Sequence, residues 1–226
     1  MKTLFLTGGS GNIGSAIKTK FEQNGYYVIA PTHEQLDLSD SDSIEQFFKF
    51  HGTNADVIIH CAGYNNPTDF EDITKEEMQK SININYLSFL EIVKIVSPSM
   101  QSKNSGHILA ISSLYGSITR KKRLAYTASK HALNGMVQTL ACELAPYNIL
   151  VNSLAPGFVD TKMTRKNNTP EQIKALESKI PLGRMADVSD IAKTAFYLCS
   201  EENTYITGQN IIVDGGFMAE GGQGNV

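Results

Sequence analysis

The strongest constraint on the fold is the alternation of short apolar runs with segments of helical spacing along the chain. The apolar run Leu4-Phe5-Leu6 ends in glycines, as a buried strand would. Apolar residues then recur at helical intervals through Ile13–Asn24, and Gly25 is a typical residue for the end of that helix. Repeated strand–helix units predict a mostly parallel sheet that is covered by helices on both faces.

The same signals predict the remaining elements. Further strands are expected at Tyr26–Ala30, Val57–Ile59, His107–Ile111, Ile149–Leu154 and Asn210–Val213. Further helices are expected at Ser41–Phe50, Lys75–Met100 with an interruption near Asn85, Leu124–Leu144 and Asp187–Cys199. No internal repeat or composition shift marks a linker, so we expect residues 1–226 to form a single domain.

One region breaks the alternation. Only residues 31–40 separate the second strand from the helix that begins at Ser41, and they contain a possible mini-strand at Leu36-Asp37-Leu38. Parallel neighbours need a crossover of about a dozen residues or more. We therefore predict an α/β fold of the Rossmann type, a doubly wound parallel sheet that is shortened between strands two and three.

Composition and charge exclude several classes of protein. The formal charge of −3 provides no field for nucleic acid or for an anionic membrane. Three widely spaced cysteines without a CxxC pair argue against a disulfide framework or a zinc site, and the five histidines are scattered, so no metal site is expected. No signal peptide and no apolar run of membrane-spanning length is present, which makes the cytoplasm the expected location.

The turn from Thr7 to Gly14 follows the first strand and opens the first helix. Its glycines permit a tight turn and close approach of a pyrophosphate, to which the helix N-terminus offers free N–H groups. We expect Gly8, Ser10, Asn12 and Ile13 to bind the phosphates of a dinucleotide.

The identity of that dinucleotide depends on the residues after the second strand. A carboxylate there commonly holds the ribose 2′-hydroxyl of NAD, and a basic residue suggests the 2′-phosphate of NADP. This chain has neither an acid nor an arginine in Ala30-Pro31-Thr32-His33. The missing carboxylate removes repulsion, and Thr32 or His33 could contact a phosphate, so NADP(H) is slightly favoured over NAD(H). The alternative is that both are turn residues.

Tyr126 and Lys130 are one helical turn apart, which places them on one helix face. A phenol with a pKa near 10 is a poor acid or base at neutral pH, and an adjacent ammonium stabilises its phenolate. Tyr126 could then protonate a carbonyl oxygen as hydride arrives, or take the proton from an alcohol in the reverse direction. Ser113 closes a predicted strand at the carboxyl edge of the sheet, where its hydroxyl could bind the substrate oxygen.

These motifs together resemble those of the short-chain dehydrogenase/reductase family over essentially the whole chain. That family has a serine thirteen positions before the tyrosine and a lysine four positions after it, as Ser113, Tyr126 and Lys130 stand here. The resemblance makes Asn85, in preference to its neighbour Asn83, the fourth catalytic residue, which holds a water in a proton relay to the lysine.

The resemblance also implies the rest of the cofactor site. Residues 152–161 look like the segment that grips the nicotinamide carboxamide, through the backbone of Val159 and the hydroxyl of Thr161, and residues 181–185 and 205–216 match further signatures. The cofactor-binding residues that we expect are Gly8, Ser10, Asn12, Ile13, Thr32, Asp37, Leu38, Ala62, Gly63, Tyr126, Lys130, Pro156, Gly157, Val159 and Thr161.

Three departures from the family pattern concern the first half of the chain. Asn12 stands where the glycine motif usually has glycine, and His60-Cys61-Ala62-Gly63 replaces the usual Asn-Asn-Ala-Gly. The shortened region resembles dehydrorhamnose reductases of the extended branch, in which residues like Asp37 and Leu38 contact the adenine. These departures leave the cofactor preference open and do not change the expected reaction.

The C-terminal half looks most like 3-oxoacyl-(acyl-carrier-protein) reductases. This implies a ketone or secondary alcohol as the small-molecule substrate, possibly as a carrier-bound thioester. The basic run Arg120–Arg123, with Arg165-Lys166, could steer an anionic carrier; a solvated loop or a subunit contact is the alternative. A sugar or nucleotide-sugar reductase, and a non-catalytic dinucleotide-sensing regulator, are alternative functions.

Two further expectations concern the segment after the fifth strand and the oligomeric state. Residues 162–179 are polar and interrupt the strand–helix rhythm; a surface excursion and a substrate lid both fit, and the position favours the lid. The resemblance implies a homodimer or homotetramer that pairs through the helices of Asn85 and Tyr126. The Gly-rich tail 219–226 could be disordered or close over a neighbour's site.

Overall fold

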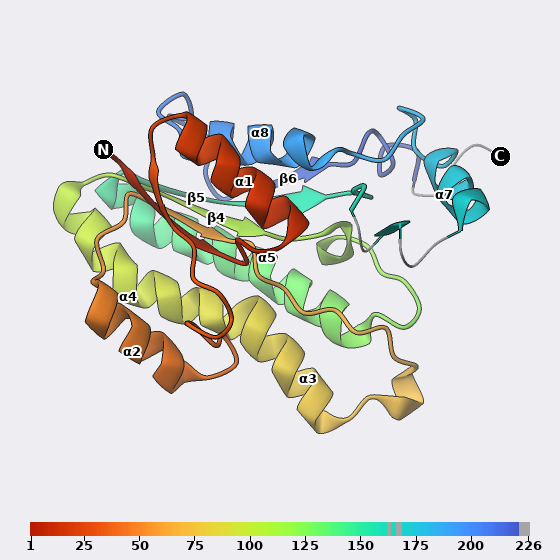
Figure 1. Cartoon of the computed structure of the whole chain (residues 1–226), viewed down its shortest axis with the longest axis horizontal. Coiled ribbons are helices and arrows are strands. Elements are labelled where there is room, and N and C mark those ends of the chain that lie inside the picture. Colours follow the sequence, from red (N-terminus) through yellow and green to blue (C-terminus); the bar gives the residue numbers. More distant parts are fainter. Residues whose placement is uncertain (162–163, 166–168, 222–226) are drawn as a thin grey trace.

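The computed structural model describes residues 1–161, 164–165 and 169–221 of the chain. Within them, six strands form one sheet in the order β2-β1-β3-β4-β5-β6, and every neighbouring pair is parallel (Figure 1). The strands are β1 (Thr3–Thr7), β2 (Tyr27–Ile29), β3 (Val57–His60), β4 (Gly106–Ile111), β5 (Ile149–Pro156) and β6 (Asn210–Val213). The principal helices are α1 (Asn12–Gln23), α2 (Ser41–His51), α3 (Lys75–Ile82), α4 (Ser88–Lys103), α5 (Leu124–Leu144), α7 (Pro170–Glu177) and α8 (Val188–Cys199). This architecture confirms the predicted doubly wound α/β sheet.

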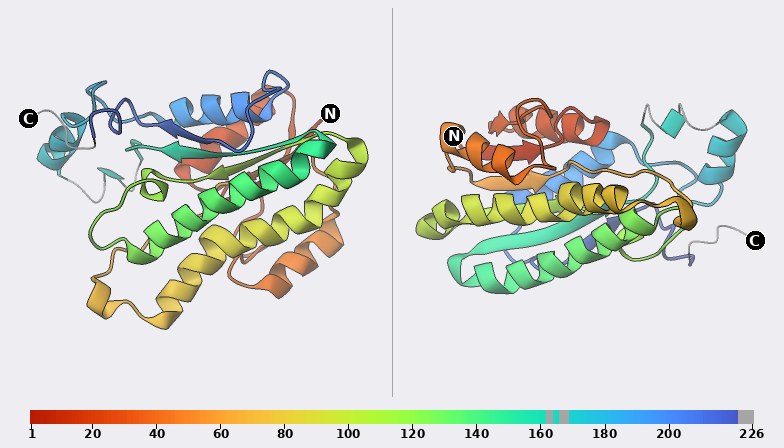
Figure 2. Two further views of the ribbon diagram at one scale, coloured as in Figure 1. Left: turned by 180° about the vertical axis from the view of Figure 1, so that it is seen from behind. Right: turned by 90° about the horizontal axis from the view of Figure 1, so that it is seen from below.

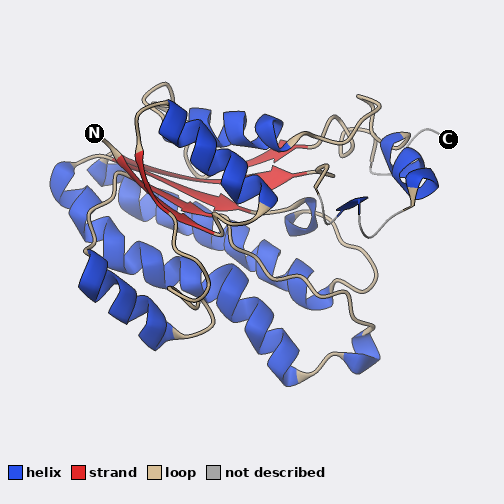
Figure 3. Cartoon of the chain, viewed as in Figure 1, coloured by secondary structure: helices blue, strands red, loops and turns tan. Residues whose placement is uncertain are grey.

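Helices cover both faces of the sheet. Helices α1 and α8 lie on one face, and α2, α4 and α5 lie on the other (Figures 2 and 3). Each layer has its own apolar cluster against the sheet, because side chains of a strand alternate between its two faces. In β1, Leu4 and Leu6 pack against α1 and α8, whereas Phe5 faces the other layer.

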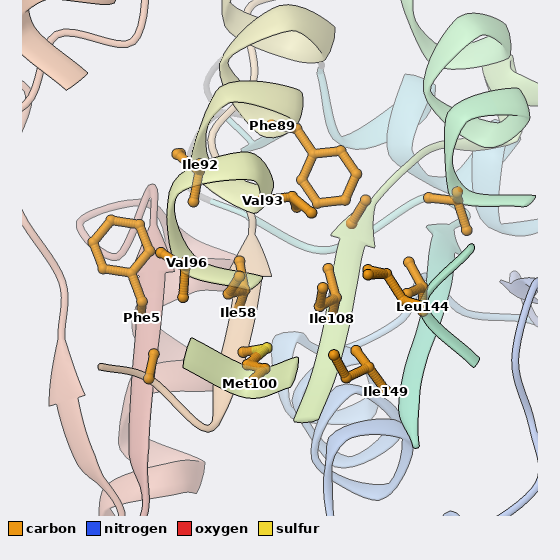
Figure 4. Packing of buried hydrophobic residues seen from close by; sticks show 14 of the residues in the cluster. Phe5, Ile58, Phe89, Ile92, Val93, Val96, Met100, Ile108, Leu144 and Ile149 are labelled. Atoms are coloured by element: carbon orange, nitrogen blue, oxygen red, sulfur yellow. The ribbon is translucent and has the colours of Figure 1, made fainter. Parts of the chain in front are cut away.

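Aromatic and aliphatic side chains fill the layer beneath α2 and α4. The ring of Phe5 lies 4.9 Å from that of Phe48 and 5.9 Å from that of Phe47, centroid to centroid. Figure 4 shows Phe5 and Ile58 from the sheet beside Val96 from α4. These side chains are almost completely buried, so their packing fixes the angle at which α2 and α4 cross the shortened edge of the sheet.

The predicted shortening between the second and third strands is confirmed. Within the described residues, the sheet has no strand on the outer side of β2, where a Rossmann sheet has one. A Rossmann sheet has the strand order 3-2-1-4-5-6. Here β2 is the edge strand, and the chain passes directly from it to α2. The mini-strand predicted at Leu36-Asp37-Leu38 was wrong: these residues belong to turns, in which the backbone N–H of Leu36 donates to the Thr32 carbonyl.

Local hydrogen bonds satisfy the backbone and side-chain groups around Asp37, so this segment does not pair with a neighbouring strand. The N–H of Asp37 donates to Ser43 Oγ at 3.0 Å, and the Asp37 carboxylate accepts from the N–H of Ser39 at 2.8 Å. Asp and Ser side chains favour such turns over extended pairing. Leu36 nevertheless becomes buried in the cluster beneath α2.

The long helix predicted at Lys75–Met100 is interrupted near Asn85, as expected. One turn of π-helix, Asn83–Leu87, separates α3 from α4, and α4 continues beyond Met100 to Lys103. Asn104 then ends α4 in a left-handed conformation with φ 52°. π-Turns of this kind often occur at functional sites.

The segment after β5 carries a small satellite lobe. Helix α7 begins with a capping box at Thr169 and Gln172, and nearby apolar residues form a third cluster around Leu114, Ile180 and Phe217. Part of the predicted lid, residues 162–163 and 166–168, lies outside the described residues. So do residues 222–226 of the tail. Among the helices that the structure describes, none is long and apolar enough to cross a membrane.

Candidate active site

The predicted site residues gather at one edge of the sheet. In the parallel register Thr7 lies beside His60, and His60 lies beside Ala110, so β1, β3 and β4 reach their carboxyl ends together. The glycine turn follows β1, Ala62 and Gly63 follow β3, and Ser113 follows β4 at this edge. Parallel α/β sheets bind their ligands there.

The glycine turn is packed too closely for side chains. Gly8 has φ +69°, and a Cβ on it would lie 2.6 Å from the backbone nitrogen of Ala62. A Cβ on Gly14 would lie 2.1 Å from the Gly8 carbonyl oxygen. Glycine is therefore required at both positions, and the backbone remains open to an approaching phosphate.

Helix α1 presents an uncapped N-terminus beside this turn. Its cap residue is Gly11, which makes no side-chain cap, and its first turn contains no acidic residue. Asn12 and Ile13 begin the helix, so their N–H groups and the positive end of the helix dipole face outward from the turn. The arrangement fits the pyrophosphate of a dinucleotide.

A cavity of about 150 Å³ adjoins the glycine turn. Six of the predicted cofactor residues line it together with His33; they are Gly8, Ser10, Asp37, Leu38, Ala62 and Gly63. Thr7, Pro31, Leu36 and Ile84 also line the cavity and were not predicted. Thr7 opens the glycine turn, Pro31 directly follows the second strand and Leu36 precedes Asp37, so the sequence carried a signal for these three and none for Ile84.

Thr32 does not line this cavity. It is exposed, and its N–H donates to the side chain of Gln35 at 2.9 Å. His33 instead lies at the cavity, with Nδ1 3.9 Å from the Asp37 carboxylate. Hydrogen bonds from Ser39 hold the pKa of that carboxyl below its usual range, so Asp37 is an anion at neutral pH. This end of the cavity, where the adenosine is predicted to bind, therefore combines one carboxylate with one imidazole.

Tyr126, Lys130 and Ser113 are brought together by α5 and the end of β4. The ammonium of Lys130 lies 5.6 Å from the centre of the Tyr126 ring, and the Ser113 side chain is close enough to the Tyr126 phenol to lower its pKa. Burial raises the pKa of Tyr126, whereas Ser113 and Arg123 act in the opposite direction. The structure therefore presents a neutral phenol beside a hydroxyl and an ammonium.

Lys130 is almost completely buried. Its Nζ donates to the Ile111 carbonyl at 2.7 Å, and burial lowers the pKa of its ammonium to about 8. A Cβ on Gly63 would lie 3.9 Å from Nζ, so glycine there keeps space open next to the ammonium. An ammonium has three donors, and the Ile111 carbonyl takes one of them.

Asn85 is fully buried in the π-turn, and both N–H donors of its carboxamide have partners. Its Oδ1 accepts from the N–H of Tyr64 at 2.7 Å, and Nδ2 donates to the Tyr64 carbonyl at 2.8 Å and to Ser129 Oγ at 2.9 Å. Ser129 in turn donates to the Tyr126 carbonyl. Asn85 therefore ties the loop after β3 to the helix of Tyr126.

The predicted nicotinamide segment follows β5. Pro156 ends the strand, and a Cβ on Gly157 would lie 2.7 Å from Asp214 Cα, so β5 and the end of β6 meet closely there. Val159 pairs with Ala186 in an isolated bridge. The hydroxyl of Thr161 contacts that of Thr164 at 2.9 Å.

The basic run Arg120–Arg123 lines a second and larger hollow of about 950 Å³. Phe70 and Leu124 add exposed apolar surface to it. Lys122 forms an ion pair with Asp69 at 2.7 Å, which leaves Arg120 and Lys121 as further cations of the lining. Of the companion pair, Lys166 lies outside the described residues, and Arg165 is held by Asp160.

Within residues 1–161, 164–165 and 169–221, no three His, Cys, Asp or Glu side chains are grouped as metal ligands.

Comparison with known proteins agrees with this geometry. The family model described as enoyl-(acyl carrier protein) reductase matches residues 12–218. The chain is 33% identical to a 3-oxoacyl-(acyl-carrier-protein) reductase of Thermotoga maritima, in an alignment that covers 96% of the chain and 98% of that relative. The chain belongs to the short-chain dehydrogenase/reductase family. It is also 31% identical to a glucose 1-dehydrogenase of Gluconobacter oxydans, over 97% of the chain and 93% of that relative.

Solved structures of short-chain dehydrogenases/reductases have the same fold. A 4-hydroxyisoleucine dehydrogenase complexed with NADH is 27% identical, with a TM-score of 0.88 and coverage of 97% of this chain and 99% of that chain. ElxO with NADP bound is 26% identical, with a TM-score of 0.87 and coverage of 96% and 99%. The chain is thus an oxidoreductase of a family that uses NAD(P), and the similarity spans both halves of the sheet.

His60 was not predicted as a site residue. The signal in the sequence was that a polar residue directly follows the apolar run Val57–Ile59. It is fully buried, and burial lowers the pKa of its imidazole to about 3 from a usual value of 6.5. Because the unfolded chain binds a proton that the folded chain rejects, the stability that His60 contributes is present above about pH 6.5 and is lost as the pH falls.

We expect His60 to make folding sensitive to mild acid. Between pH 7 and pH 5 the free energy of unfolding should fall by about 2 kcal/mol through this group. In His60→Gln, which has no titrating side chain there, the fall should be smaller by about that amount. Urea unfolding of both proteins at the two pH values measures the difference; equal falls would show that His60 is not held neutral.

Proposed function

We propose that the protein interconverts a ketone and a secondary alcohol by hydride transfer, with Tyr126 as general acid/base, and that it acts as a 3-oxoacyl-thioester reductase. The observation that carries this proposal is that Ser113 and the buried ammonium of Lys130 both lie near the Tyr126 side chain, and that Ser113 lowers the pKa of its phenol. A substrate carbonyl that accepts hydrogen bonds from Ser113 and Tyr126 would be polarised and aligned for protonation.

Each of these residues has a distinct part. Tyr126 donates its phenolic proton to the oxygen as hydride arrives, and Ser113 holds that oxygen. The Lys130 ammonium stabilises the phenolate that remains, and its two free N–H donors can hold ribose hydroxyls. Because both amide donors of Asn85 hold other groups, we assign its part in a proton relay to its acceptor oxygens, the carboxamide Oδ1 or the main-chain carbonyl.

The nicotinamide cofactor supplies the hydride when it is bound. We assign its pyrophosphate to Gly8, Ser10, Asn12 and Ile13, its adenosine to Asp37, Leu38, Ala62 and Gly63, and its carboxamide to the segment from Pro156 and Gly157 to Val159 and Thr161. The fit rests on two features of this chain, the uncapped start of α1 and a glycine turn whose space a Cβ would fill.

The satellite lobe favours an acyl substrate over a sugar. Its packing places Ile118, Phe158 and Met218 as half-buried apolar side chains against Leu114, which directly follows Ser113. Such a surface suits an acyl chain, whereas a sugar needs convergent polar partners. A sugar dehydrogenase remains the second candidate, because a glucose 1-dehydrogenase is among the similar relatives.

The surface near α5 fits a carrier-bound substrate. Arg120 and Lys121 border a hollow with apolar walls, which suits an acidic partner that brings an apolar group. The outer face of α5, with Ala128, Ala132 and Gly135 exposed, suits close packing of a second copy, in keeping with a homodimer or homotetramer.

Replacing Tyr126 by Phe tests the reaction directly. We expect Tyr126→Phe to lower kcat/KM about 10²- to 10⁴-fold for a 3-oxoacyl thioester, because the proton donor is lost. NADPH affinity should change little, and Tyr147→Phe, which removes an exposed and distant phenol, is the matched control. The assay follows nicotinamide absorbance with a panel of acyl thioesters, simple ketones and sugars.

Turnover of sugars alone would replace the thioester proposal with the sugar dehydrogenase. Absence of turnover on the whole panel, together with unchanged cofactor binding, would favour the non-catalytic regulator.

For the cofactor we propose a slight preference for NADP(H) over NAD(H), because His33 lines the adenosine end and no acid follows β2 directly. Titration should give NADPH at least about fivefold tighter binding than NADH, about 1 kcal/mol. His33→Ala should remove that difference and leave NADH affinity unchanged. Equal affinities in the wild type, or tighter NADH, would indicate that Asp37 governs this end of the cavity.

A further inference from the structure

His60 occupies a position between the two halves of the site. It ends β3, it is fully buried, and both ring nitrogens have partners. Nδ1 lies 3.0 Å from Thr7 Oγ1, at the end of β1, and Nε2 lies 3.1 Å from the Ile84 carbonyl oxygen, in the π-turn. One imidazole thus joins the strand before the glycine turn to the turn that carries Asn85.

The partners select a single tautomer. The Ile84 carbonyl can only accept, so Nε2 carries the hydrogen and donates. Thr7 Oγ1 already accepts from the N–H of Ala62 at 3.2 Å, so its own hydrogen is free to donate to Nδ1. Every group in this chain of hydrogen bonds is satisfied in one direction, from Ala62 through Thr7 and His60 to Ile84.

The π-turn leaves the Ile84 carbonyl oxygen free to accept the hydrogen bond from His60. In a regular α-helix the N–H of Ser88 would donate to Ile84, but here it donates to Asn83. The Ile84 carbonyl accepts from His60 and from the hydroxyl of Ser88, at 2.9 Å, instead. His60 is one of the two side-chain donors to this buried carbonyl, and loss of a donor there is costly, so His60 stabilises the wider turn that places Asn85.

We propose that His60 is a positioning residue, which holds the π-turn of Asn85 in a fixed relation to the glycine turn through its two hydrogen bonds. Its kinetic consequence rests on the function proposed above, whereas its structural consequence does not. Loss of the Nε2 donor would let the turn relax towards regular helix and shift the main chain of Asn85 relative to Lys130.

Two substitutions separate the two nitrogens of the ring. His60→Gln can place an amide nitrogen near the position of Nε2 and keep the bond to Ile84. His60→Asn is shorter, so it can keep the contact with Thr7 but not the one with Ile84. Both replace an imidazole by a carboxamide, but Asn is smaller by one methylene, so a role in packing alone predicts faster exchange at both ends of His60 in His60→Asn, around Thr7 as well as in residues 83–89.

The first readout is hydrogen exchange of the backbone in peptides that contain residues 83–89, which needs no substrate. We expect exchange in His60→Asn to be at least about tenfold faster there than in the wild type, and His60→Gln to stay within about threefold. Equal exchange in the two variants, or no change in His60→Asn, would overturn the proposal.

The second readout is kcat against KM. We expect kcat to fall at least about tenfold in His60→Asn, with KM for the cofactor within about threefold, and His60→Gln to retain most of kcat. Unchanged kcat in a folded His60→Asn would overturn the catalytic consequence. A wild type without turnover would contradict the proposed function and leave the exchange experiment to decide the role of His60.

Discussion

A single buried ammonium joins the parts of this site. Lys130 lies on α5, and its Nζ donates to the carbonyl of Ile111 at the end of β4. An ammonium that is removed from water must be partnered, so this contact fixes the helix against the carboxyl edge of the sheet. Tyr126 lies one turn earlier on the same helix, and Ser113 lies two residues beyond Ile111. The relation of the hydroxyl, the phenol and the ammonium therefore follows largely from one hydrogen bond.

The rest of the site depends on the parallel register. Because β1, β3 and β4 end together, the glycine turn, Ala62-Gly63 and Ser113 open onto one edge. A Rossmann sheet has a further strand beyond β2, which is the edge strand here. The strands that bring the site residues together, β1, β3 and β4, do not depend on that further strand. Without that strand, the loop after β2 is short, and it brings His33 and Asp37 to the end of the cavity to which we assign the adenosine.

Much of this could be predicted from the sequence, because the decisive signals are local. Apolar period and glycine punctuation predict the sheet and its helices, and the spacing of Ser113, Tyr126 and Lys130 predicts their meeting once α5 follows β4. The sequence did not predict the features that depend on contacts between residues far apart in the chain. At Leu36–Leu38, Ser39 and Ser43 satisfy the backbone in turns. The form of the π-turn depends on donors from His60 and Ser88, and no local pattern encodes the partners of His60.

We propose that one dinucleotide spans this edge from the start of α1 to Tyr126, and a crystal structure of the NADPH complex would show its path. We expect the pyrophosphate to lie at the N–H groups of Asn12 and Ile13, and the nicotinamide to lie between Tyr126 and Val159 with its ribose at Lys130. A cofactor bound elsewhere, or one whose nicotinamide lies away from Tyr126, would contradict it.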